Sequence, residues 1–328
     1  MLQRLNAFLQ KWMPFITPTS VILGVTILSF LHSYAFLVTW IFAFISFASC
    51  IGLNINEIKE SIAKPLKIVM CLLIIQVIMP LVAFLVGFIF FNGDIYTITG
   101  LVLAFTIPTG VVSLMWVSIY QGDRALTLSI VLINTIISPL TVPFILNLLL
   151  GANISMDTFG LMQSLFLMIV APSLLAIYIT KLLKERAKQT ATMLAPFSKI
   201  ALIFVIIING AVVSPYFINI DGRVVAIAIT VLLISCSAYT IGLLITFLFN
   251  WDKRTAISIM YNSGMRNNGA GAALAITYFP PTVAFPVVLA ILFQQFLASM
   301  SGKLVEIYLF KQEETEEKND KTALKKSM

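Results

Sequence analysis

The stretch Asn262-Ser263-Gly264-Met265-Arg266-Asn267-Asn268-Gly269 interrupts an otherwise apolar segment that runs from about residue 255 to residue 279. It starts roughly ten residues, or about 15 Å of helix, into that segment, near the middle of a bilayer core about 30 Å thick. Polar, glycine-rich backbone is tolerated at that depth only where it faces protein or a water-filled cavity. The stretch therefore predicts a broken membrane helix with a site at its break.

The rest of the chain has the composition of a membrane protein. Of its 328 residues, 59% are hydrophobic and only 11% are charged, against roughly 25% charged in soluble domains. We predict an all-α polytopic fold of ten transmembrane helices, each of about 20 residues, which leaves no room for a soluble catalytic domain. The segments are residues 15–31, 35–55, 66–91, 96–121, 125–149, 158–181, 194–214, 223–249, 255–279 and 283–309.

Basic residues set the predicted orientation. With the N-terminus in the cytoplasm, 19 of the 21 basic residues, including Lys59, Lys64 and Lys199, fall on the cytoplasmic side. Arg223 lies outside, and Arg266 belongs to neither side. The positive-inside rule then predicts a multi-pass protein of the cell membrane with both termini cytoplasmic. The mixed-charge tail, residues 311–328, is predicted to be disordered.

A second break is predicted in segment 96–121, at Thr106-Ile107-Pro108-Thr109-Gly110. Pro108 lacks an amide donor and Gly110 permits non-helical backbone, although an ordinary kink remains an alternative. The two broken segments are the fourth of each five and run antiparallel, as in inverted five-helix repeats that cross at the midplane. Helix N-termini that begin near the membrane centre favour an anion, above all a carboxylate. The predicted substrate-binding residues are Thr109, Gly110, Ser113, Arg266, Asn267, Asn268 and Gln295.

Arg266 is the most informative of the predicted substrate-binding residues. Its side chain reaches roughly 6 Å, less than half the distance to either membrane surface, so it must face protein, water or ligand. Two compatible roles follow from that position. Arg266 either holds the free carbonyls of the broken helix ends or contacts the substrate.

Several motifs, in order and spacing, resemble the bile acid:sodium symporter family. They are Gln76 before Met79-Pro80, Pro108-x-Gly110-x-x-Ser113, and Gly264-Met265-x-Asn267 before Ala273-Leu274-Ala275. The resemblance implies one transporter domain, residues 1–310. Segments 3–5 and 8–10 would form a core, and segments 1, 2, 6 and 7 a panel that rocks against it. Family substrates are organic anions, normally driven by two sodium ions.

The chain departs from this family at the ion sites. Where the family has Glu-x-Gly-x-Gln-Asn, this chain has Asn262-Ser263-Gly264-Met265-Arg266-Asn267, and the family's Ser-Asn pair is Ser113-Leu114. The former sodium-site positions are Gln76, Ser113, Leu114, Thr127, Asn262 and Arg266. Our hypothesis is that the Arg266 guanidinium takes the place of the second sodium ion, donates to Gln76 and Asn262, and makes transport sodium-independent.

The sequence also allows other functions. A sodium symporter with one altered site would use Ser113, Thr127, Asn262 and backbone carbonyls. A membrane sensor would bind an anion without moving it. An enzyme is excluded, because no carboxylate pair, intramembrane histidine or metal-ligand set is present, His32 being the only histidine. We predict no cofactor and no resident metal, a small organic anion as substrate, a lipid bilayer as surroundings, and no nucleic acid partner.

Overall fold

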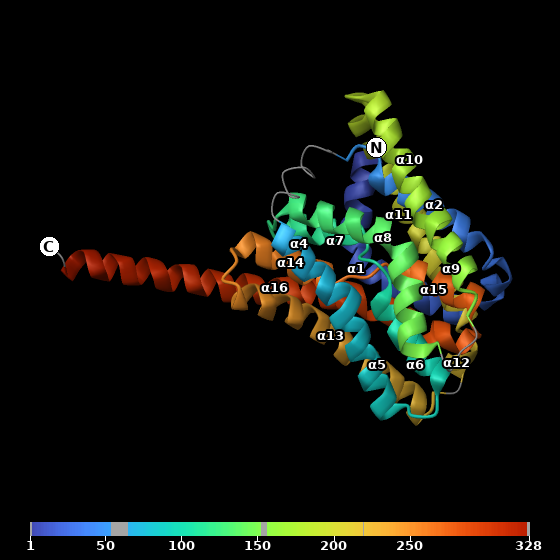
Figure 1. Cartoon of the computed structure of the whole chain (residues 1–328). Coiled ribbons are helices and arrows are strands. Elements are labelled where there is room, and N and C mark those ends of the chain that lie inside the picture. The colour runs from blue at the N-terminus through green and yellow to red at the C-terminus, as the bar shows by residue number, and fades with distance from the viewer. Residues whose placement is uncertain (1, 54–64, 152–155, 219, 327–328) are drawn as a thin grey trace.

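The computed structural model of the chain (Figure 1) describes residues 2–53, 65–151, 156–218 and 220–326. These residues form helices and no strand. Six of the described helical stretches are long and apolar enough to cross a membrane, judged by length and composition: Pro65–Phe90, Arg124–Leu150, Thr158–Leu183, Arg186–Val212, Gly222–Leu248 and Pro281–Ile307. The chain is therefore an all-helical, multi-pass membrane protein. Two of the basic residues assigned to the cytoplasmic side, Lys59 and Lys64, lie outside the described residues.

The helices fall on the predicted segments. The unbroken ones are α1 (Leu2–Thr26), α2 (Leu37–Cys50), α8 (Arg124–Leu150), α11 (Arg186–Val212), α13 (Gly222–Leu248) and α16 (Pro281–Lys326). Short helical turns at Ser29–Tyr34 (η1) and Pro215–Ile218 (α12) connect some of them. Both α1 and α11 begin earlier than predicted, because hydropathy marks only the apolar part of a helix and the polar turns before it give no such signal.

Two helical rods each contain a π-helical turn. One runs from α4 (Pro65–Leu73) through Ile74–Ile78 into α5 (Met79–Phe90), and the other from α9 (Thr158–Leu165) through Phe166–Val170 into α10 (Ala171–Leu183). A proline follows each π turn by two residues, Pro80 in the first and Pro172 in the second. Proline removes a backbone donor and crowds the preceding turn, which a wider turn accommodates. Gln76 lies inside the first π turn.

Both predicted breaks are present. The fourth segment divides into α6 (Ile95–Thr106) and α7 (Val112–Ile119), and the ninth into α14 (Lys253–Gly264) and α15 (Asn268–Tyr278). Each break is only a few residues long, so the two halves of each segment remain neighbours along the chain. Because the helix is interrupted, backbone groups at both breaks lack helical hydrogen-bond partners.

The most extensive helix contacts form two sets, which are joined by contacts of α1 with α16 and of α8 with α9. In the first, α11 packs against α1 and α2, and α2 also packs against α10. In the second, α13 packs against α14, α6 against α5 and α16, and α15 against α16. Helices α1 and α11 approach closely, since a Cβ atom on Gly24 would lie 2.2 Å from the carbonyl oxygen of Ile207. Small residues are what allow membrane helices to pack at this distance.

Loop aspartates cap the helices that follow them. Asp94, Asp123, Asp157, Asp221 and Asp252 each accept a hydrogen bond from a backbone N–H in the first turn of the next helix. Asp252 also accepts bonds from the Thr255 hydroxyl at 2.7 Å and the Lys67 ammonium at 3.2 Å. Partial burial raises the pKa of Asp252, but these hydrogen bonds outweigh it and lower the pKa to about 2. The loop carboxylates therefore have a structural role.

The C-terminal residues differ from the disordered tail predicted for residues 311–328. Helix α16 continues as far as Lys326 and extends away from the rest of the molecule (Figure 1). The sequence of this extension has Glu and Lys four residues apart, at Glu314 and Lys318 and again at Glu317 and Lys321. Such spacing favours a helix. The composition of the tail, which suggested disorder, is also compatible with a helix.

Candidate functional site

The two breaks meet, and their backbones are hydrogen-bonded to each other. The Gly110 amide donates to the Met265 carbonyl at 3.3 Å, and the Asn267 amide donates to the Pro108 carbonyl at 2.9 Å. These bonds form an isolated antiparallel bridge between Thr109 and Arg266. Backbone groups that lost their helical partners at one break are thus satisfied by the other break. We refer to this meeting point, residues 107–111 and 265–267, as the crossing.

A chain of buried side-chain hydrogen bonds connects the crossing to neighbouring helices. The Thr109 hydroxyl donates to the Asn262 carbonyl at 2.9 Å. The Asn134 amide donates to the Thr109 hydroxyl at 3.5 Å, and the Gln76 amide donates to the Asn134 oxygen at 2.5 Å. Asn134, in α8, is fully buried and was not among the predicted residues. The available signal was a lone asparagine inside an apolar span, where polar side chains commonly join helices.

Arg266 is buried and unpaired. It is 1% exposed, and none of its three guanidinium nitrogens has a hydrogen-bond partner in the described part of the chain. Cys71 of α4 and Tyr239 of α13 are among the side chains that lie near it. A buried cation without a partner is costly. Such a charge is consequently a marker of function in a membrane protein.

The hydrogen bonds expected from Arg266 are not found. Neither Gln76 nor Asn262 accepts one, and the oxygen of each side-chain amide is itself unpartnered among the described residues. Their NH₂ groups are used elsewhere, Gln76 toward Asn134 and Asn262 toward the Ser258 carbonyl. The side chains that lie near Arg266 include Cys71 of α4 and Tyr239 of α13. The alternative role, holding the free carbonyls at the helix ends, is not observed either.

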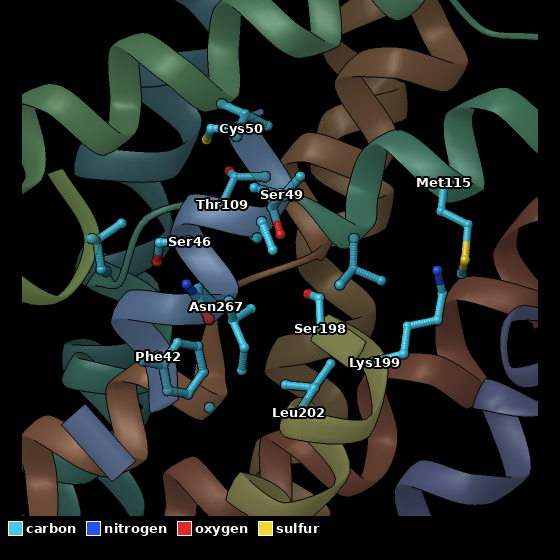
Figure 2. Close-up of a pocket in the computed structure, with 18 of the residues that line it drawn as sticks. Phe42, Ser46, Ser49, Cys50, Thr109, Met115, Ser198, Lys199, Leu202 and Asn267 are labelled. Atoms are coloured by element: carbon cyan, nitrogen blue, oxygen red, sulfur yellow. The ribbon is translucent and has the colours of Figure 1, made fainter. Parts of the chain in front are cut away.

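A cavity of about 350 Å³ lies beside the crossing (Figure 2). Six of the seven predicted substrate-binding residues line it: Thr109, Gly110, Arg266, Asn267, Asn268 and Gln295. The seventh, Ser113, is the second residue of α7, is fully buried and does not line the cavity. Both half-helices that start at the crossing contribute their first residues to the wall, with Val112 from α7 and Asn268 from α15. Two helix N-termini therefore face the same space.

The amides along this wall are each hydrogen-bonded. The Asn267 side chain caps α15 by accepting from the Ala270 amide at 3.4 Å. Asn268 donates to the Gln294 oxygen at 3.0 Å, and the Trp116 indole donates to the Gln295 oxygen at 3.0 Å. These bonds fix the orientation of the amides. Gln295 lines the cavity, and in the described structure its NH₂ group makes no such hydrogen bond.

The remaining walls are largely apolar. Phe42, Leu202, Ile206 and similar side chains from α2, α8, α11 and α16 line them. Ser46, Ser49 and Ser198 add hydroxyl groups, and the lining also includes Lys199 of α11 (Figure 2). Lys199 was predicted to lie on the cytoplasmic side because of its charge, and it was not predicted to line a cavity. A cavity with polar groups at the crossing, a lysine in its lining and apolar sides suits an organic anion.

The remaining positions assigned to sodium sites lie away from the cavity. Ser113, Thr127 and Asn262 are fully buried, and the side-chain oxygen of each has no hydrogen-bond partner in the described ranges. Leu114 packs against a small apolar cluster of buried side chains that includes Leu128. No group of three or more acidic, histidine or cysteine side chains that could hold a metal occurs among the described residues. The donors available for a cation are neutral oxygens.

Apolar membrane-crossing helices and two broken helices that meet beside a cavity define a membrane transporter. The chain belongs to the Sodium Bile acid symporter family, whose profile matches residues 39–220. The family resemblance is thereby confirmed, and the protein is a transporter and not an enzyme.

The relatives agree with this assignment. The chain is 43% identical over 300 residues to Uncharacterized protein YbaS of Bacillus subtilis (strain 168), a match covering 91% of this chain and 98% of the relative. It is 25% identical to Uncharacterized sodium-dependent transporter YocS of the same organism, over 89% of this chain and 90% of the relative. It is 24% identical to Probable sodium/metabolite cotransporter BASS1, chloroplastic, of Oryza sativa subsp. japonica, over 71% of this chain and 57% of the relative.

Proposed function

We propose that the protein is a secondary transporter that carries a small or amphipathic organic anion across the cell membrane by alternating access. Arg266 would supply a fixed positive charge where sodium symporters of the family bind an ion, so transport would be sodium-independent. The observation that carries the proposal is that Arg266 and two helix N-termini line one cavity.

The charge balance at the crossing supports an anionic substrate. The described ion pairs, Lys67 with Asp252 and Arg223 with Asp94, involve surface residues, and neither includes Arg266. An anion bound beside Arg266 would supply the missing opposite charge, and the two helix N-termini would add their partial positive charges. The cavity volume of about 350 Å³ suits a small organic molecule, and its apolar walls suit a hydrocarbon body.

The packing supports movement of two bodies against each other. In the proposed architecture, ten transmembrane helices form two inverted repeats of five, with both termini in the cytoplasm. Helices α1, α2, α9, α10 and α11 would form the panel, and the other membrane helices the core. Residues of both groups line the cavity, for example Phe42 and Leu202 from the panel and Thr109 and Asn267 from the core. Rocking of one group against the other would then expose the cavity to each side in turn.

Two observations favour sodium independence. The family's carboxylate is Asn262 here, and Leu114 replaces an oxygen ligand. A monovalent cation would therefore meet only neutral oxygens in the neighbourhood of a buried guanidinium, which repels it in a medium of low dielectric constant. The fixed charge of Arg266 would supply the positive charge that a bound sodium ion supplies in a symporter.

One observation favours the alternative, a sodium symporter with a single altered site. The oxygens of Ser113, Thr127 and Asn262 are buried and have no hydrogen-bond partner in the described chain. Unpartnered buried oxygens are hard ligands of the kind that sodium prefers. Arg266 then has to lie far enough from such a site to permit binding.

A carboxylate screen separates the two functions. The purified protein is heated with each of a set of small and amphipathic carboxylates, once in sodium chloride and once in choline chloride. The proposal predicts at least one stabilising carboxylate, with equal shifts of melting temperature in the two salts. The triple change Leu114→Asn, Asn262→Glu, Arg266→Gln is expected to create sodium dependence. A stabilisation that requires sodium in the wild type would establish the symporter instead.

A further inference from the structure

A second cation lies in the cavity, away from the crossing. Lys199 is half-buried on α11, and its ammonium donates to the Asn6 side-chain oxygen of α1 at 2.6 Å. Asn6 is neutral, and the described part of the chain offers Lys199 no ion pair. Figure 2 shows the Lys199 side chain extending toward Met115 of α7, across the cavity from Asn267. Lys199 is thus a positive group with its charge uncompensated.

The position of Lys199 differs from that of an ordinary interfacial lysine. Lysines near helix ends usually extend their ammonium groups into water along the membrane surface. Lys188, which is exposed on the same helix, is free to do so. Lys199 is instead tied to a neighbouring helix, and four of its neighbours on α11 line the cavity with it: Ala195, Ser198, Leu202 and Ile206. The bond to Asn6 holds the ammonium between α11 and α1, and both of these helices contribute residues to the cavity lining.

Helix α11 also fixes the spacing between the two positive regions. Asn209 of α11 donates to the Gly269 carbonyl in the first turn of α15, at 3.2 Å. Lys199 precedes Asn209 by ten residues, or about 15 Å along the helix axis. Because the lysine side chain is long and flexible, an elongated molecule spanning on the order of 10 Å reaches both the α15 N-terminus and the ammonium.

We infer that Lys199 is a second anion-binding residue, and that the cavity selects an elongated dianion with one anionic group at the crossing and the other at Lys199. The inference rests on the proposed anion site at the crossing. The apolar side chains between the two ends, such as Leu202 and Ile206, would contact the hydrocarbon chain that joins the two groups. On binding, the second carboxylate would replace or share the Asn6 oxygen as acceptor.

The test compares acids that differ in one group. Nonanoate and azelate have the same carbon skeleton, and azelate carries a second carboxylate at the far end, whereas the two carboxylates of succinate are too close together to span the cavity. Binding to the purified full-length protein is measured by titration calorimetry. We expect azelate to bind about tenfold more tightly than nonanoate, the contribution of one charge-assisted hydrogen bond, and succinate to show no such gain.

Variants at Lys199 test whether this residue causes the preference for azelate over nonanoate. Lys199→Met is expected to bring the affinities for azelate and nonanoate together while leaving the affinity for nonanoate nearly unchanged. Lys199→Arg keeps the preference. Lys188→Met removes an equal charge from the exposed face of the same helix and is expected to keep the preference too.

A labelling measurement on the wild type avoids any dependence on how the variants fold. An amine-reactive acylating reagent is added, and modification of Lys199 is followed by mass spectrometry. Azelate is expected to slow the modification several-fold and nonanoate to leave it unchanged. Equal labelling with both acids, or a preference for azelate that survives in Lys199→Met, would overturn the inference while leaving the proposed function intact. If neither acid binds, the anion site and the inference both fail.

Discussion

The polar side chains in and around the broken helices fall into two sets that differ in their hydrogen bonding. Asn267, Asn268 and Gln295 line the cavity, and each makes at least one hydrogen bond within the protein. Arg266, Ser113 and Thr127 are also buried, but their side chains make none in the described structure. Each member of the first set thus has a partner within the protein, although the side-chain oxygen of Asn268 has none among the described residues. The second set leaves polar groups without partners, which indicates positions kept for binding or inherited from an ion site.

The largest expected effect comes from removing the charge of the second set. Arg266→Met should weaken binding of the best carboxylate in the screen by about a hundredfold, because a charge-assisted contact is lost. Stability should be unchanged or higher, since the variant replaces an unpaired buried charge with an apolar side chain. Calorimetry and thermal unfolding measure the two effects.

A matched control uses the paired arginine at the surface. Arg223→Met removes the partner of Asp94 and should leave carboxylate binding unchanged. A destabilised Arg266→Met protein with normal binding would instead make Arg266 a structural residue and would remove the contrast between the two sets.

The next largest effect tests the network that joins the crossing to α8. Asn134→Ala leaves both the Gln76 amide and the Thr109 hydroxyl short of a partner, and should lower the free energy of unfolding by about 1–3 kcal/mol. Asn147→Ala, at an exposed position of the same helix, should change it by less than about 0.5 kcal/mol. Denaturant unfolding in mild detergent measures both, and equal effects would show that the network contributes nothing particular.

A smaller effect distinguishes the two sets directly. Asn268→Ala should reduce carboxylate affinity by about tenfold, since the amide at the first turn of α15 lines the cavity. Ser113→Ala removes an unpartnered hydroxyl away from the cavity, so affinity should be unchanged and stability equal or slightly higher. Reduced affinity in Ser113→Ala would show that Ser113 takes part in substrate binding after all.

The smallest effect concerns a charge that is fully paired. The native pKa of Asp252 is about 2, below the value of about 3.9 for an unfolded chain. Its contribution to stability is therefore complete above the unfolded pKa and is lost as the pH falls from about 4 to about 2. Asp252→Asn should unfold with less dependence on pH in that window than the wild type, and should match its pH dependence from pH 6 to 8.

Prediction from sequence worked where local chemistry was decisive. Pro108 and the polar stretch around Arg266 predicted both helix breaks, because missing donors and glycine act on the backbone nearby. Asn134 was not predicted, since an isolated asparagine shows neither its partner nor its direction. Lys199 was assigned to the cytoplasmic side from its charge, because hydropathy locates the end of a span but does not show which way a side chain faces. The direction of Arg266 likewise depends on packing between distant helices.

The helix ends show the same difference between what the sequence predicts and what it does not. The apolar parts of α1 and α11 were located correctly, whereas their polar first turns carry no hydropathic signal. The C-terminal extension of α16 was predicted to be disordered, and that stays a prediction. Its composition resembles that of a disordered segment, but the spacing of its charges suits a helix.

The measurement that most directly tests the central claim is substrate uptake into proteoliposomes with and without sodium. Wild-type protein is reconstituted, and uptake of the best-binding carboxylate is followed in sodium, potassium and choline salts of equal ionic strength. If Arg266 provides the fixed cation at the crossing, the three initial rates should agree within about twofold, and Arg266→Met should abolish uptake in all three. A several-fold increase that requires sodium would contradict the account.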